Sequence, residues 1–237
     1  MARINPDWLN AFLDYSQFGE APRHMYFWAG VSAVAGALRR KVWIDQAYFK
    51  WYPNFYICLV APPGIVSKST TAGVAMGLLR QVPGIKFGPD VVTWPALVSA
   101  FAESTEGFEY NGMIYPMSAM TLESSEFGNL LNPQYMVGGG FTSRTIFVYA
   151  DTKERYVAYP GLKVPANLAQ QAADLVSDLT HISTLAGEYV LTKDAVAWGE
   201  DWYKTHYSVR AANLDPDRFG GYIARKQTHV HKLAMVL

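Results

Sequence analysis

The stretch "FYICLVAPPGIVSKSTT", residues 55–71, decides which fold this sequence favours. Residues 55–60 are continuously apolar or aromatic, which is typical of a buried central strand in a parallel sheet. A loop containing prolines and a glycine follows. Residues 69–81 then carry apolar side chains at helical spacing, with Val74, Leu78 and Leu79 on the inward face. A buried strand, a short loop and a helix form the repeating unit of α/β proteins, so we expect an α/β fold.

Lys68 and Ser69, at the start of that helix, are the residue types that bind phosphates and Mg²⁺ in phosphate-binding loops. In such loops the backbone N–H groups and the positive helix end face the anion, the lysine reaches the terminal phosphates, and the Ser or Thr hydroxyl ligates Mg²⁺. We therefore expect ATP and Mg²⁺ as cofactors. The residues expected to hold the nucleotide are Pro63, Gly64, Ser67, Lys68, Ser69 and Thr70, with Ser69 also on the metal.

The loop departs from the usual motif at two positions. Counting back from Lys68, Pro62 and Ser67 stand where the standard spacing places glycines. The change at Ser67 matters more, because glycine there allows a positive φ and a close approach of the backbone to phosphate. The alternative interpretation is an ordinary strand-to-helix turn that happens to contain Lys-Ser.

A second segment, "MSAMTLESSEFGNLL" at 117–131, reads as a strand that ends in a polar, acidic turn. A nucleoside triphosphatase needs an acid at the end of a neighbouring strand, which holds Mg²⁺ through water and polarises the attacking water. Glu123 and Glu126 are the candidates. Ser125-Glu126 stands at the place of the usual Asp-Glu pair, so we predict Glu126 as the catalytic acid and Ser125 with Glu126 near the metal. A solvated turn with two surface acids is the alternative.

A third segment, "GGGFTSRTIFVYA" at 138–150, places Arg144 between a glycine-rich turn and an apolar strand. This arrangement suits an arginine finger, which neutralises charge on the γ-phosphate and often acts across a subunit boundary. We therefore include Arg144 with Lys68 and Glu126 as the predicted catalytic residues. An arginine in a surface ion pair is an equally open interpretation.

Composition excludes several classes of protein. Half of the 237 residues are hydrophobic, which is typical of a folded chain rather than a disordered one. Lys plus Arg equals Asp plus Glu at 20 each, so the chain is not a globally basic nucleic-acid binder. The single cysteine, Cys58, excludes a disulfide framework and is predicted to be a small core residue. No uncharged apolar stretch reaches the ~20 residues that a membrane span needs, so we expect a cytoplasmic protein with no membrane partner.

Local patterns also predict the remaining elements. Helices are expected at 5–15, at 22–40, and at 94–103 with Thr93 as N-cap, and two short strands around Asp45. Beyond Pro160, apolar residues recur at helical spacing near 165–185, 192–212 and 221–237. We therefore predict a P-loop NTPase-like α/β core with N-terminal helices at 1–160 and a helical subdomain at 161–237.

Taken in order, these segments resemble the phage and prophage P-loop domain of primase-helicase-like proteins, catalogued as a domain of unknown function. The resemblance covers nearly the whole chain and includes "FWAGVSAVAGALRRKVWID", "WYPNFYICLVAPPGIVSKSTTA", "DVVTWPALVSAF", "LESSEFGNLL" and "GGFTSRTIFVYAD". It implies a RecA/AAA+-like ATPase core with a mainly parallel sheet, usually oligomeric. It also implies a helicase-like role in phage DNA replication in the bacterial host cell, with single-stranded DNA and replication proteins as partners.

By the same resemblance, Lys68 and Ser69 match the family's loop, Ser125-Glu126 its acidic pair, and Arg144 the arginine after its glycine turn. The sequence departs from the family between "NLLNP" and "MVGGGF", where members carry a longer insertion that includes a strand with a polar sensor residue. A shortened, non-catalytic module of NTPase fold, binding a replisome partner or DNA, is therefore the alternative. The Ser67 substitution and the short connection favour this alternative, and the retained charged residues disfavour it.

Overall fold

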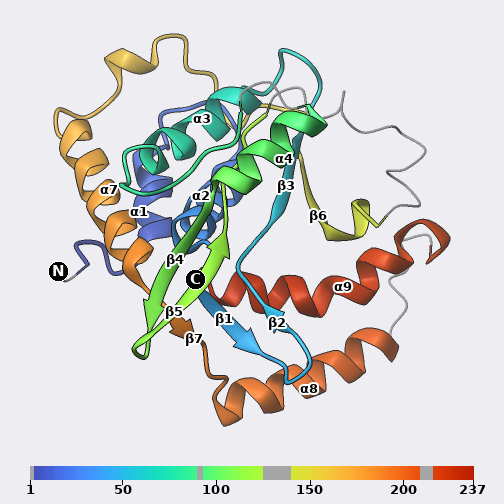
Figure 1. Cartoon of the computed structure of the whole chain (residues 1–237). Helices are drawn as coiled ribbons and strands as arrows, with labels where there is room; N and C mark the ends of the chain where they lie inside the picture. The colour runs from blue at the N-terminus through green and yellow to red at the C-terminus, as the bar shows by residue number, and fades with distance from the viewer. Residues whose placement is uncertain (1–2, 90–92, 125–139, 209–215) are drawn as a thin grey trace.

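The computed structural model describes residues 3–89, 93–124, 140–208 and 216–237 and shows a mixed α/β protein (Figure 1). Its helices are α1 Trp8–Tyr15, α2 Arg23–Leu38, α3 Lys68–Leu79, α4 Trp94–Glu103, α7 Leu168–Thr184, α8 Lys193–Ser208 and α9 Pro216–Ala234, with short 3₁₀ turns η1 Thr142–Arg144 and η2 Pro160–Leu162. The helices expected from the sequence are confirmed within the described residues, and residues 209–212 of the segment expected at 192–212 lie outside them. Thr93 caps α4 as expected, because its side chain accepts a hydrogen bond from the Ala96 N–H.

The strands within the described residues form three small sheets. In the first, β1 Val42–Asp45 lies between antiparallel β2 Lys50–Trp51 and parallel β7 Gly187–Glu188. In the second, β3 Tyr56–Val60 and β6 Thr145–Tyr149 pair in parallel. The third is the antiparallel hairpin of β4 Thr105–Tyr110 and β5 Met113–Ser118. The α/β class and the two short strands around Asp45 are thus confirmed.

The hydrophobic core is built around α2, which packs against α1, α3 and α7. Small residues on α2 let these helices approach closely. A Cβ atom at Gly30 would lie 2.8 Å from the Phe12 ring, and one at Gly36 would lie 2.6 Å from the Leu79 side chain. The alanine- and glycine-rich sequence of this helix therefore reflects tight packing, as its composition suggests.

The β3–β6 pair carries one face against this core and one face toward solvent. Ile57, Leu59, Ile146 and Val148 belong to the core side. The opposite face is exposed and consists of Tyr56, Cys58, Val60, Phe147 and Tyr149. The predictions that β3 is buried on both faces and that Cys58 is a core residue are therefore wrong. A continuous apolar run is compatible with either arrangement, because the run does not encode what covers each face.

The hairpin β4–β5 is absent from the sequence-based prediction, which placed a strand at the start of 117–131 instead, and only Met117 and Ser118 of that segment belong to β5. That segment contributes an isolated bridge between Thr121 and Phe87, and its part beyond residue 124 lies outside the described residues. The hairpin turn is Asn111-Gly112, with φ angles of 53° and 72°. Asn-Gly is the preferred dipeptide for a two-residue hairpin turn, so the signal was present in the sequence.

The last third of the chain contributes to the same core. Leu175, Leu179 and Ile182 of α7 are buried in it, and β7 extends the sheet of β1. The proposed division at residue 160 stays a prediction. No helix among the described residues has both the length and the apolar character needed to cross a membrane.

The N-terminal segment is held on α7 by one buried carboxylate. Asp178 is 1% exposed and accepts hydrogen bonds from the backbone N–H groups of Ile4 and Asn5, at 2.6 and 2.8 Å, and from the Asn5 side chain. Trp8 adds a bond from its indole nitrogen to the Leu175 carbonyl.

We predict that Asp178→Ala lowers the free energy of unfolding by about 3 kcal/mol, because two backbone donors lose their acceptor at a buried site. The measurement is urea denaturation followed by tryptophan fluorescence. Asp174→Ala, one turn earlier on α7 and bonded to the Gln170 side chain, is the matched control and should change stability by less than about 1 kcal/mol. Equal effects of the two substitutions would contradict this role of Asp178.

Candidate functional site

The predicted phosphate loop connects the carboxyl end of β3 to the start of α3, as a phosphate-binding loop requires. Val60 ends the strand, residues 61–67 form the loop, and Lys68 is the first residue of the helix. Since β3 and β6 run in parallel, the carboxyl end of β6 lies at the same edge, and the Ala150 N–H donates to the Val60 carbonyl at 3.0 Å. Strand, loop and helix thus stand in the predicted order, with the helix N-terminus at the sheet edge (Figure 1).

Ser67 does not adopt the positive φ that glycine favours. Its φ and ψ are −73° and 63°, the geometry of an inverse γ-turn, and the Lys68 N–H donates to the Val66 carbonyl at 2.7 Å. The Lys68 ammonium folds back on the loop and donates to the Ala61 carbonyl at 2.6 Å. Two groups that a phosphate would use are therefore bonded to the loop itself.

Other parts of the loop are open to an anion. Pro63, Gly64, Ser69 and Thr70 are exposed. The hydrogen bonds described at the start of α3 are made by the N–H groups of Lys68 and Thr71, and those of Ser69 and Thr70 take no part in them. Gly64 has a φ of 73°, a conformation that glycine adopts at little cost. These exposed residues could therefore bind a phosphate at the N-terminus of α3 once the turn at Ser67 opens.

The structure separates Glu123 from this loop. Its carboxylate pairs with Arg80 at 3.5 Å, and Arg80 caps the C-terminal end of α3. Twelve residues of helix separate Arg80 from Lys68, which corresponds to about 18 Å. Glu123 is therefore not placed to assist a metal at Ser69. Ser125 and Glu126, the predicted acidic pair, lie outside the described residues.

Arg144 also lies away from Lys68, at the other end of the strand pair. Thr145, the next residue, pairs with Tyr56 at the amino end of β3, whereas Lys68 follows the carboxyl end. Five paired residues span about 13 Å. Within one chain, Arg144 therefore does not share a site with Lys68. It lines a separate hollow with residues of α9 instead.

Asp151 is an acid that the sequence-based reasoning missed. It follows β6 at the edge where the phosphate loop begins, and its side chain is exposed. The signal was an acid two residues after an apolar strand, in "TIFVYAD" at 145–151. Because β6 is the parallel neighbour of β3, Asp151 occupies the kind of position in which NTPases place a metal-binding acid.

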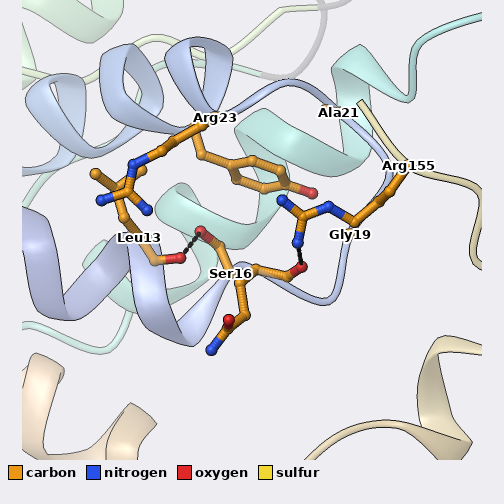
Figure 2. A pocket seen from close by; sticks show the side chains of 8 residues that line it. Leu13, Ser16, Gly19, Ala21, Arg23 and Arg155 are labelled. Carbon is orange, nitrogen blue, oxygen red and sulfur yellow. Dashed lines mark hydrogen bonds between the residues drawn. The ribbon is translucent and has the colours of Figure 1, made fainter. Parts of the chain in front are cut away.

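A second cavity, next to the turn between α1 and α2, is too small for a substrate. Arg155 and Gln17 line it, and the Arg155 guanidinium donates to the Gln17 carbonyl. Figure 2 shows the Ser16 hydroxyl donating to the Leu13 carbonyl at the same place. Its volume of ≈ 20 Å³ holds about one water molecule. The described residues contain no group of three or more His, Cys, Asp or Glu side chains that could hold a metal ion.

Comparison with protein-family models and with curated proteins found no match for this chain.

We predict that Ser67→Gly strengthens the binding of tripolyphosphate by roughly tenfold, the equivalent of one hydrogen bond to a charged group. Glycine can reach a positive φ, which would release the Lys68 N–H from the Val66 carbonyl. Ser67→Ala removes the hydroxyl but keeps the restricted φ, so it serves as the control and should bind as the wild type does. Calorimetric titration measures both, and an equal gain in the two variants would contradict the role of the turn.

Proposed function

We propose that this protein binds ATP with Mg²⁺ through the loop between β3 and α3 and works as a P-loop ATPase in phage DNA replication. The observation that carries the proposal is the parallel β3–β6 pair with Lys68 and the α3 N-terminus at its carboxyl edge. A RecA/AAA+-like core, a helicase-like role and assembly into an oligomer belong to the same proposal.

In this proposal Lys68 binds the terminal phosphates and the N–H groups of Ser69 and Thr70 bind the anion at the helix end. The Ser69 hydroxyl would ligate the Mg²⁺ that accompanies the phosphates, and Asp151 would supply a carboxylate at the same edge. Bound Mg²⁺ would offset the negative charge of the triphosphate. Glu126 keeps its proposed role as the acid that orients water.

A second candidate is a non-catalytic module of the same fold that binds a replisome partner or DNA. It is favoured by one observation, the inverse γ-turn at Ser67, which occupies the Lys68 N–H and leaves the lysine side chain bonded to Ala61. In this case the loop would be a structural turn, and the chain would act through a different surface.

Calorimetric titration with Mg-ATP separates the two candidates. We expect micromolar binding by the wild type and a loss of at least roughly tenfold in Lys68→Ala, because the charge-assisted hydrogen bonds of the ammonium disappear. Lys163→Ala, at an exposed position after η2, removes the same charge and should bind normally. Absence of binding by folded wild-type protein would contradict the ATP proposal and support the non-catalytic module.

We further predict that Asp151→Asn abolishes the gain in ATP affinity that Mg²⁺ gives, because the amide carries no charge for the hydrated metal. The measurement compares ATP titrations with Mg²⁺ and with EDTA. Asp194→Asn, at the start of α8, is the matched control. If Mg²⁺ strengthens ATP binding equally in Asp151→Asn and in the wild type, Asp151 is not near the metal.

A further inference from the structure

The hollow beside Arg144 is a pocket of ≈ 180 Å³ that is lined by several cationic side chains. We call it the Arg144 pocket, and it is lined by Asn54, Tyr56, Arg144, Arg225, Thr228, His229 and Lys232. α9 lies across the amino end of β3 and β6 and supplies four of these residues (Figure 1). The packing is fixed by His229, whose Nε2 donates to the Ser143 carbonyl in η1 at 3.2 Å.

Three cationic side chains, Arg144, Arg225 and Lys232, meet in this pocket with no acidic partner. None of the ion pairs found within the described residues involves any of them. Burial, then the charges of Arg225 and Arg144, lower the pKa of Lys232 to about 8. Like charges that crowd together at a partly buried site repel one another, and a bound anion would relieve this repulsion.

The hydrogen bonds leave donors available for such an anion. Lys232 is oriented by the backbone carbonyl and the side-chain oxygen of Asn54, at 2.8 and 2.7 Å. Arg144 is held by one nitrogen, which donates to the Gly140 carbonyl at 2.8 Å. No hydrogen bond or ion pair involves the side chain of Arg225 in the described part of the chain, so its guanidinium can offer all of its donors.

An aromatic surface adjoins the cations. Tyr56 lines the pocket while 51% of the residue stays exposed, and its ring lies 5.6 Å from that of Phe141. An aromatic ring beside a group of cations is the combination that binds single strands, because bases stack on the ring while the phosphates meet the charges. A free phosphate would use the cations and gain nothing from the exposed ring.

We propose that the Arg144 pocket binds a backbone phosphate of single-stranded nucleic acid, with an adjacent base stacked on Tyr56. The pocket lies at the opposite end of the β3–β6 pair from Lys68, so the strand and a nucleotide at the loop do not compete for the same groups. This proposal does not depend on ATP binding, because Lys68→Ala leaves every residue of the pocket in place.

The test is the fluorescence anisotropy of a labelled oligothymidylate of about 12 nucleotides, within the usual range for one strand-binding fold. We expect Arg225→Gln to weaken binding roughly tenfold through the loss of a charge-assisted phosphate contact, and Arg225→Lys to restore part of it. Lys163→Gln is the charge-matched control. Arg225→Gln should also reduce the dependence of log K on log salt by about 0.7, the contribution of one contact to a single strand. If Arg225 only supported the fold of the pocket, its substitution would leave this slope unchanged.

A second substitution separates stacking from charge. Tyr56→Ala should weaken strand binding by roughly tenfold, and Tyr56→Phe should bind as the wild type does, because base stacking needs the ring and not the hydroxyl. Tyr56 is half-exposed, and melting temperatures of both variants check that the fold is retained.

The pH dependence follows from Lys232, whose depressed pKa means that it loses its charge as the pH rises through about 8. The groups around it are Arg144 on η1, Arg225 and His229 on α9, and the neutral Asn54 and Tyr56. Burial lowers the pKa of His229, which is therefore neutral near pH 7. We expect strand binding to be strongest below pH 7 to 8 and to weaken toward pH 9.

Loss of strand binding in Arg225→Gln with normal binding in Lys163→Gln and Lys68→Ala supports the proposal. Unchanged strand binding in both Arg225→Gln and Tyr56→Ala overturns it. Tripolyphosphate binding that depends on Arg225, without any binding of the oligonucleotide, also overturns it, since the pocket would then be a site for free phosphates.

Discussion

The parallel pairing of β3 with β6 fixes where the charged groups of interest lie. Because both strands point the same way, their carboxyl ends share one edge, with the loop before Lys68 and the acid Asp151. Their amino ends share the other edge, with Arg144 and the cationic residues of α9. The pair is covered on one side by α2, and its residues Ile57, Leu59, Ile146 and Val148 belong to the hydrophobic core that α2 forms with α3 and α7. Lys68 and Arg144, which the sequence analysis grouped in one catalytic set, thus lie at opposite ends of the strand pair.

The conformation of the loop at Ser67 is compatible with both proposed functions, ATP binding and a non-catalytic module. With Ser67 in an inverse γ-turn, the Lys68 N–H and ammonium are bonded to Val66 and Ala61. Phosphate binding requires that these bonds exchange for bonds to the anion, at a net cost that is small for each exchanged bond. The exposed N–H groups at the start of α3 and the flexible Gly64 make that exchange local. The preference of Ser67 for negative φ is what opposes it.

Much of the fold follows from local patterns, and the contacts that complete the sites do not. α1 and α7 were predictable because apolar residues recur at helical spacing, α2 because Pro22 begins a run rich in alanine and glycine, and α4 because Thr93 caps it. The Asn111-Gly112 turn could have indicated the β4–β5 hairpin, and Asp151 could have been noticed as an acid after an apolar strand. The exposure of Cys58 depends on what covers the sheet, which no run of apolar residues encodes. The meeting of Arg144 with Lys232 joins residues far apart in the chain, and no local spacing indicates it.

A competition between the two ligands tests most directly whether they bind at opposite ends of the β3–β6 pair. Wild-type protein is first bound to labelled oligothymidylate and then titrated with Mg-ATP, while strand anisotropy and ATP binding are both followed. If the sites lie at opposite ends of the β3–β6 pair, ATP binds with unit stoichiometry and the strand stays bound. Displacement of the strand in proportion to the ATP bound would mean that both ligands use one site, which would contradict the account.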